Sequence, residues 1–101
     1  HQFLYLGFLP KKSAGARKVL DTWKHFEGSI IIYESKHRIE KTLLSIIETL
    51  GPDRFICLSK ELTKIHETFH VGKVSEVLEK MKTSSSKGEF TLVLAPEGYS
   101  L

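Results

Sequence analysis

The sequence predicts one α/β domain whose five-stranded, mostly mixed sheet is flanked by about three helices. Short apolar segments rich in β-branched residues alternate with amphipathic segments, an order typical of a central sheet covered by helices. The chain has 101 residues, enough for one hydrophobic core and one domain. Its hydrophobic content of 41% and charged content of 27% are ordinary for a globular protein.

Strands are predicted at five apolar segments, which cover residues 3–8, 29–33, 54–59, 68–73 and 89–95. The second segment is apolar without interruption, which indicates a strand covered on both faces. Too few residues separate the third strand from the fourth for a parallel crossover helix. We therefore expect these strands to make the sheet mixed.

Helices are predicted where apolar residues recur at a spacing of three or four. The first covers about residues 14–26, and the third begins near Val74. The second has the clearest apolar stripe, with Ser35 as its predicted N-cap and Gly51 as its stop. That stripe comprises Ile39, Leu43, Leu44, Ile47 and Leu50. The core is predicted to include Trp23, Ile31, Leu44, Ile47, Phe55 and Leu92.

Composition argues against several classes of protein. The apolar segment over residues 3–10 is too short to cross a bilayer and is not built like a signal peptide, so we expect a cytoplasmic protein with no membrane partner. The single cysteine, Cys57, permits no internal disulfide and is expected to be a small buried hydrophobic residue rather than a nucleophile. A net charge of +3 is compatible with an RNA partner without requiring one. The first residue, His1, suggests a fragment of a longer protein.

The segment His66-Glu67-Thr68-Phe69-His70 matches a zinc-protease pattern in which a helix places two histidines on one face. Its β-branched and aromatic residues favour a strand instead. On a strand the two imidazoles would lie about 13 Å apart, too far to share one metal ion. We therefore predict no metal site.

Polar clusters adjoin three of the apolar segments. Residues 33–38 follow the second predicted strand, residues 60–67 follow the third, and residues 87–89 precede the fifth. Polar side chains at strand ends are how α/β folds build ligand sites. Structural alternatives stay open, with Ser35 as a helix cap and residues 61–67 as a salt-bridged surface turn. A basic segment is equally compatible with a solvated face and with phosphate contacts; it contains Lys11, Lys12, Arg17 and Lys18.

Four short motifs together carry a resemblance to a known family. They are Phe3-Leu4-Tyr5-Leu6-Gly7-Phe8-Leu9-Pro10, Tyr33-Glu34-Ser35-Lys36-His37-Arg38, Glu61-Leu62-Thr63-Lys64 and His66-Glu67. The chain resembles the tetrapyrrole (corrin/porphyrin) methylases, and within them the branch of ribosomal RNA small-subunit cytidine 2′-O-methyltransferases. The resemblance covers the C-terminal half of that family. Lys36 stands where the family typically has proline, which relaxes the turn without abolishing the site.

The resemblance implies that the full enzyme binds S-adenosylmethionine between two α/β domains and that residues 1–101 are the C-terminal one. It also implies ribosomal RNA or the small ribosomal subunit as substrate, with the N-terminal domain and a second copy as partners. The cofactor-binding residues that it suggests are Gly7, Phe8, Leu9, Pro10, Ser35 and His37. The suggested substrate-binding residues are Glu34, Arg38, Glu61, Lys64, His66, Glu67 and Glu89. No catalytic residue is assigned, and this half alone is expected to be inactive. Two alternatives stay open, a tetrapyrrole C-methyltransferase and a stand-alone RNA-binding module.

Overall fold

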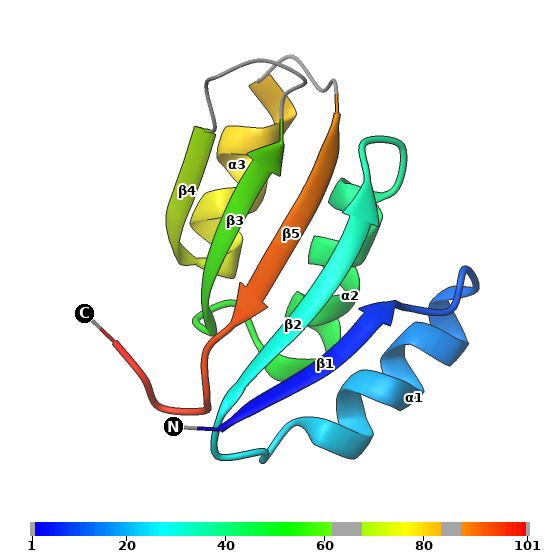
Figure 1. Ribbon diagram of the computed structural model, residues 1–101, viewed down its shortest axis with the longest axis vertical. Helices are drawn as coiled ribbons and strands as arrows, with labels where there is room; N and C mark the ends of the chain where they lie inside the picture. Colours follow the sequence, from blue (N-terminus) through cyan, green and yellow to red (C-terminus); the bar gives the residue numbers. More distant parts are fainter. Residues whose placement is uncertain (1, 62–67, 84–87, 101) are drawn as a thin grey trace.

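The computed structural model describes residues 2–61, 68–83 and 88–100, which form eight helices and strands in the predicted order (Figure 1). The elements are β1 (Phe3–Phe8), α1 (Ser13–Trp23), β2 (Ser29–Ser35), α2 (Ile39–Leu50), β3 (Phe55–Glu61), β4 (Thr68–Lys73), α3 (Val74–Thr83) and β5 (Glu89–Leu94). The predicted bounds are confirmed for β1 and β4, and most others are displaced by a few residues at one or both ends.

The five strands form one mixed sheet in the order β1-β2-β5-β3-β4. β1 and β2 are parallel, whereas β5 is antiparallel to both β2 and β3, and β4 is antiparallel to β3. Consequently β1, β2 and β3 end where β4 and β5 begin. We call this edge of the sheet the loop end. The prediction of a mixed five-stranded sheet is confirmed.

All three helices lie on one face of this sheet (Figure 1). Burial alternates along β2, where Ile30, Ile32 and Glu34 are buried and the residues between them are only partly covered. The helix-covered face of the sheet and the inner faces of the helices build one core. Its most deeply buried apolar side chains include Leu20, Ile32, Leu43, Ile46, Leu58, Val77, Phe90 and Leu92.

No helix of the described residues lies over the opposite face of the sheet, so within residues 2–61, 68–83 and 88–100 the prediction that β2 is covered on both faces is wrong. Two rows of mainly apolar residues cross this helix-free face. One row is Tyr5, Ile31, Val93, Cys57 and Val71, and the other is Phe8, Tyr33, Thr91, Ser59 and Phe69. These rows are half-buried at the centre and exposed on the outer strands. Cys57 is accordingly half-buried rather than buried.

Three other predictions about local packing are wrong. Trp23 is 38% exposed, because it is the last residue of α1, where its ring contacts that of Phe26 edge to face. Leu44 is 48% exposed, since α2 packs between α1 and α3 and turns this side chain outward. Ser35 belongs to β2 and caps no helix; α2 begins after Arg38. Gly51 ends α2 as predicted, with a φ of 92° that favours glycine.

Candidate functional site

Candidate residues from three separate strands meet at the loop end of the sheet. Ser35, the last residue of β2, pairs with Glu89, the first residue of β5, and Glu89 pairs in turn with Glu61 of β3. The next row inward joins Glu34, Phe90 and Lys60. The strand order therefore brings together clusters that lie far apart in the sequence, as expected for polar residues at strand ends.

Glu34 points into the helix-covered side of the sheet, not towards solvent. It is 1% exposed, and its carboxyl oxygens accept hydrogen bonds from the Thr42 hydroxyl at 2.6 Å and from the Ser35 backbone N–H at 2.9 Å. A buried carboxyl group needs such donors, because leaving it without them is costly. Glu34 thus joins the end of β2 to the first turns of α2.

Arg38 follows Glu34 on the turn between β2 and α2 and reaches a different loop. Its Nη2 atom donates hydrogen bonds to the backbone carbonyls of Pro10 at 3.2 Å and Lys11 at 2.8 Å. Its own backbone N–H donates to the Ser35 carbonyl at 3.1 Å, which closes the turn. The guanidinium group therefore fastens the loop after β1 to the turn after β2. His37 and Lys36, which lie between these anchors, are exposed.

The end of β1 carries the first group of suggested cofactor residues. The pairing of β1 with β2 shifts between Tyr5 and Gly7, and Gly7 has a φ of 69°, a left-handed conformation suited to glycine at a bulge. Beyond this bulge Phe8 is 65% exposed, whereas Leu9 is buried and only 4% exposed. Pro10 is exposed and its carbonyl is held by Arg38.

An aromatic cluster continues from this loop across the helix-free face. The ring of Tyr33 contacts those of Tyr5 and Phe8 edge to face, at centroid distances of 5.4 and 6.0 Å. A hydrogen bond with Tyr33 raises the pKa of the Tyr5 hydroxyl. Beside this cluster lies a surface hollow of about 240 Å³ lined by Phe8, Tyr33, Glu89, Phe90 and Thr91.

Sequence reasoning missed Thr42 and Thr91 as parts of this region, and it placed Tyr33 in the polar cluster after the second strand without giving it a role. The hydroxyl of Thr42 lies on the apolar side of α2, where a lone Thr is unremarkable in a sequence. Tyr33 and Thr91 pair across β2 and β5. The alternation of residue types along β2 could have placed Tyr33 on the opposite face from Glu34, had the two faces been distinguished.

Several suggested residues fall outside the part of the chain that the structure describes. These are Lys64, His66 and Glu67, and the side chain of Glu61 is likewise not described. His70 lies on β4, as the strand prediction required. Among the described residues no group of three potential metal ligands occurs.

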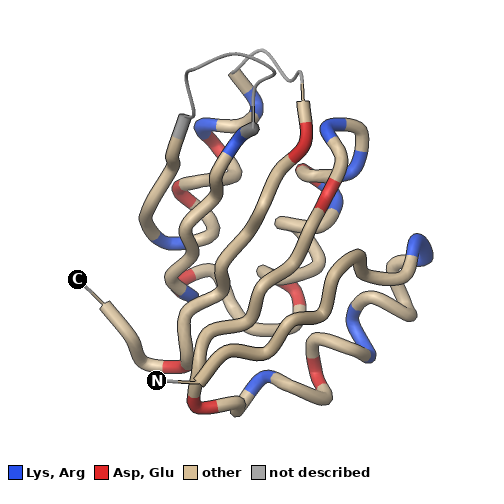
Figure 2. The backbone as a smooth tube through the Cα atoms, in the orientation of Figure 1, with Lys and Arg blue, Asp and Glu red and all other residues tan. Residues whose placement is uncertain are grey.

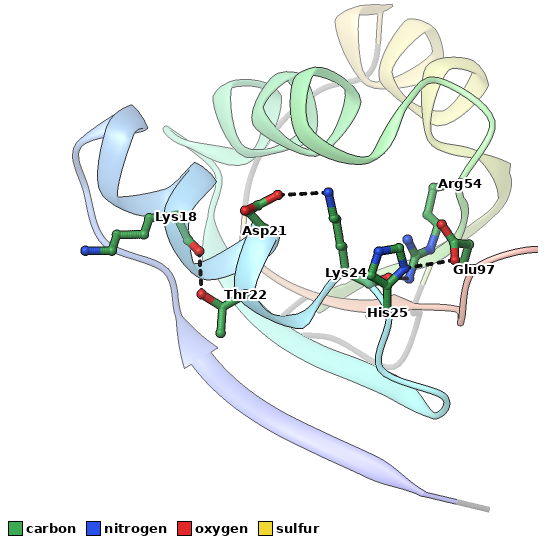
Figure 3. A network of polar contacts seen from close by, with 7 residues as sticks. All are labelled: Lys18, Asp21, Thr22, Lys24, His25, Arg54 and Glu97. Carbon is green, nitrogen blue, oxygen red and sulfur yellow. Dashed lines mark hydrogen bonds and ion pairs between the residues drawn. The ribbon is translucent and has the colours of Figure 1, made fainter.

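A second polar cluster lies at the opposite end of the sheet (Figure 3). Arg54 is 7% exposed and donates hydrogen bonds from Nε to the Ala95 carbonyl at 2.8 Å and from Nη2 to the Lys24 carbonyl at 3.1 Å. Burial lowers the pKa of Arg54, and the carboxylate of Glu97 partly opposes this effect. His25 contacts Glu97 at 3.0 Å, with both side chains exposed. These contacts tie three loops together, so we interpret this cluster as structural.

Charged residues lie on helices, loops and strand ends, whereas the middle of the sheet is uncharged (Figure 2). Lys11, Lys12 and Lys18 are exposed, and Arg17 lies 3.9 Å from Glu48 in a solvent-exposed ion pair. Exposed pairs of this kind contribute about 0–1 kcal/mol.

Curated proteins of one kind match this chain along nearly its whole length. Ribosomal RNA small subunit methyltransferase I of Escherichia coli is 39% identical over 98 residues, which are 97% of this chain and 34% of that protein. The Helicobacter pylori protein of the same name is 36% identical over 102 residues, covering 95% of this chain and 35% of its own length. This chain is related to these methyltransferases. It spans about a third of their length, less than the half that the resemblance implied. No protein-family profile matches the chain.

Solved structures show the same fold. The methyltransferase CobJ superposes with a TM-score of 0.68 at 16% identity, covering all of this chain and 44% of its own. The uroporphyrin-III C-methyltransferase of Thermus thermophilus, solved with S-adenosyl homocysteine, gives a TM-score of 0.58 at 14% identity, over 96% of this chain and 42% of that one. The fold of the tetrapyrrole methylases is thereby confirmed for this chain.

Proposed function

We propose that this chain is the C-terminal domain of an S-adenosylmethionine-dependent methyltransferase that modifies a cytidine 2′-hydroxyl of small-subunit ribosomal RNA. The observation that carries the proposal is the 39% identity to a ribosomal RNA small subunit methyltransferase along 97% of the chain. Because the chain spans about a third of such proteins, the activity belongs to the whole protein, and this chain alone is expected to be inactive.

The loop end supports a share in a cofactor site, not a complete one. The hollow beside Phe8 holds about 240 Å³, whereas pockets for small molecules usually measure about 300–1,000 Å³. Its exposed aromatic ring and backbone polar groups suit a flat, partly apolar ligand such as the adenosine of S-adenosylmethionine. Gly7, Phe8, Leu9, Pro10, Ser35 and His37 would form one wall, and the N-terminal domain would supply the others. The cofactor when bound supplies the electrophilic methyl group.

The substrate side of the proposal rests on the exposed turn after β2 and the ends of β3 and β5. His37 and Lys36 offer hydrogen-bond donors that suit phosphate or ribose oxygens. We retain Glu61, Lys64, His66, Glu67 and Glu89 as proposed substrate-binding residues. Glu34 and Arg38 make their hydrogen bonds within the chain, so we propose that they support this region from behind. Positioning the acceptor against the methyl group is the main task of such a surface. The proposed location is the cytoplasm, where a ribosomal substrate is met; no helix in the described ranges is long and apolar enough to span a membrane.

A homodimer is part of the proposal, and we assign to it the row Tyr5, Ile31, Val93, Cys57 and Val71 of the helix-free face, because the other row lines the hollow at the loop end. The assigned row contains no Asp, Glu, Lys or Arg. A row without charges has nothing to repel its own copy across a two-fold axis. This row also offers no cation to RNA phosphate, so a protein partner suits it better than the substrate does.

The proposal is tested by methyl transfer to small ribosomal subunits, with the full-length protein and labelled S-adenosylmethionine. His37→Ala at the loop end should lower kcat/KM about ten- to a thousand-fold, the effect of losing one positioning contact. His25→Ala is the matched control, because that histidine is also exposed but lies at the opposite end of the sheet. Equal activity of the two variants would contradict the site. Methylation of a tetrapyrrole instead of ribosomal RNA, or RNA binding without methylation, would contradict the function.

A further inference from the structure

Two loops at the loop end of the sheet are joined by side chains that sequence reasoning assigns to the substrate. The loop after β1, residues 9–12, carries suggested cofactor residues, and the end of β2 with the turn after it, residues 35–38, carries others. Arg38 bridges them by donating from a single nitrogen atom to two successive carbonyls, those of Pro10 and Lys11. The two loops lie 27–28 residues apart in sequence, so this bridge is a tertiary contact.

The base of the bridge is buried and hydrogen-bonded. Glu34 accepts one hydrogen bond from the backbone at the start of the turn and one from Thr42 on α2. The carbonyl of Arg38 accepts from the backbone N–H of Thr42 at 2.9 Å, so the turn is fastened at both its ends. Thr42 is 3% exposed. A chain of contacts therefore runs from α2 through Glu34 and the turn to Arg38 and the loop after β1.

These observations favour a positioning role over direct contact with RNA. Glu34, at 1% exposure, presents almost no surface to a ligand. The Nη2 atom of Arg38 already donates to two backbone carbonyls, so this part of the guanidinium group is engaged within the chain and does not form the bidentate fork that phosphate takes. Loops that must hold a ligand need such support, because a displacement of about 1 Å can cost a hundred-fold in rate.

We infer that Glu34, Thr42 and Arg38 form a clamp that fixes the loop after β1 against the turn after β2, and that Arg38 serves the reaction as a positioning residue. This inference rests on the proposed function for the reaction that the clamp serves. The clamp itself is a property of the chain and can be tested without activity.

The rate of trypsin cleavage reports how firmly the loop after β1 is held, because Lys11 and Lys12 are exposed cleavage sites inside it. In the full-length protein, Arg38→Ala and Arg38→Lys should both speed cleavage at these lysines several-fold under native conditions, as followed by mass spectrometry. Thr42→Val, which keeps the shape and removes the hydroxyl donor, should act in the same direction, and Thr42→Ser should restore protection. Lys80→Ala on α3 is the control and should leave the rate unchanged. Unchanged cleavage in both Arg38 variants would overturn the clamp.

Kinetics separate the clamp from a charge contact. If Arg38 positions loops, Arg38→Lys should lower kcat about as much as Arg38→Ala, by ten-fold or more, with little change in the salt dependence of RNA binding. If Arg38→Lys keeps full kcat while Arg38→Ala raises KM for RNA and flattens its salt dependence, Arg38 contacts phosphate and the inference is wrong. Faster cleavage in the variants of a protein that methylates no RNA would support the clamp and refute the proposed function.

Discussion

Arg54 offers the sharpest test of how the described chain is held together. Its guanidinium group lies beneath the surface where the end of α1, the turn after α2 and the segment after β5 meet (Figure 3). An arginine always carries its charge in proteins, so its burial is tolerable only while its N–H groups have acceptors. Here the carbonyls of Ala95 and Lys24 are those acceptors.

Arg54→Ala should lower the free energy of unfolding by about 2–4 kcal/mol. Each carbonyl left without its donor costs about 1–3 kcal/mol. Removing a desolvated cation returns part of that cost. The remainder is still a large share of the ~5–15 kcal/mol that stabilises a domain.

The measurement is urea denaturation of the 101-residue chain, followed by circular dichroism. Arg54→Lys should recover less than half of the loss, since an ammonium group cannot donate in two fixed directions. Arg17→Ala is the matched control; its exposed ion pair with Glu48, at 3.9 Å, should contribute less than about 1 kcal/mol. A loss below about 1 kcal/mol for Arg54→Ala would show that solvent replaces both hydrogen bonds and that the cluster is not a structural joint.

Three further predictions concern packing, cofactor and assembly. Trp23→Ala should cost about 1 kcal/mol in urea denaturation, not the ~3–5 kcal/mol of a buried aromatic, because the ring is 38% exposed; a loss above 3 kcal/mol would contradict this exposure. The isolated chain should show no S-adenosylmethionine binding at micromolar concentrations in titration calorimetry, and low-micromolar affinity would argue against a shared site. Val93→Lys, at the centre of the helix-free face, should convert a dimeric full-length protein to monomers in sedimentation velocity without lowering its melting temperature by more than a few degrees; an unchanged dimer would place the interface elsewhere.

The order of elements was predictable because each strand and helix has a clear local pattern. Runs of β-branched residues, and apolar residues that recur every three or four positions, are properties of short segments. They can be recognised without tertiary information. The start of α2 was not predictable in this way. Serine is a common helix cap, but Ser35 is the last residue of β2 and its backbone pairs with Glu89 of β5 in the sheet. Tertiary pairing overrode a local preference.

The candidate site was predictable in position and not in roles. Polar residues at strand ends did converge on one edge of the sheet, because strand direction decides where they meet. Whether a polar residue faces solvent or the core depends on its position in the alternation along the strand. Glu34 alternates in step with Ile30 and Ile32, so its side chain points to the same face and is buried with theirs. Its partner Thr42 comes from another element, and no spacing in the sequence connects the two.

The wrong prediction for β2 is itself informative about the complete protein. An uninterrupted apolar strand is typical of a sheet covered on both faces, and this chain covers only one. The uncovered rows carry Tyr5 at 61%, Phe69 at 58% and Val71 at 45% exposure. Each 100 Å² of apolar surface left in water forgoes about 2.5 kcal/mol of burial. A second hollow of about 240 Å³ lies on the same face, beside Cys57 and Val93. The sequence of β2 therefore matches a sheet with a second cover, which another copy of this face would supply in the proposed homodimer.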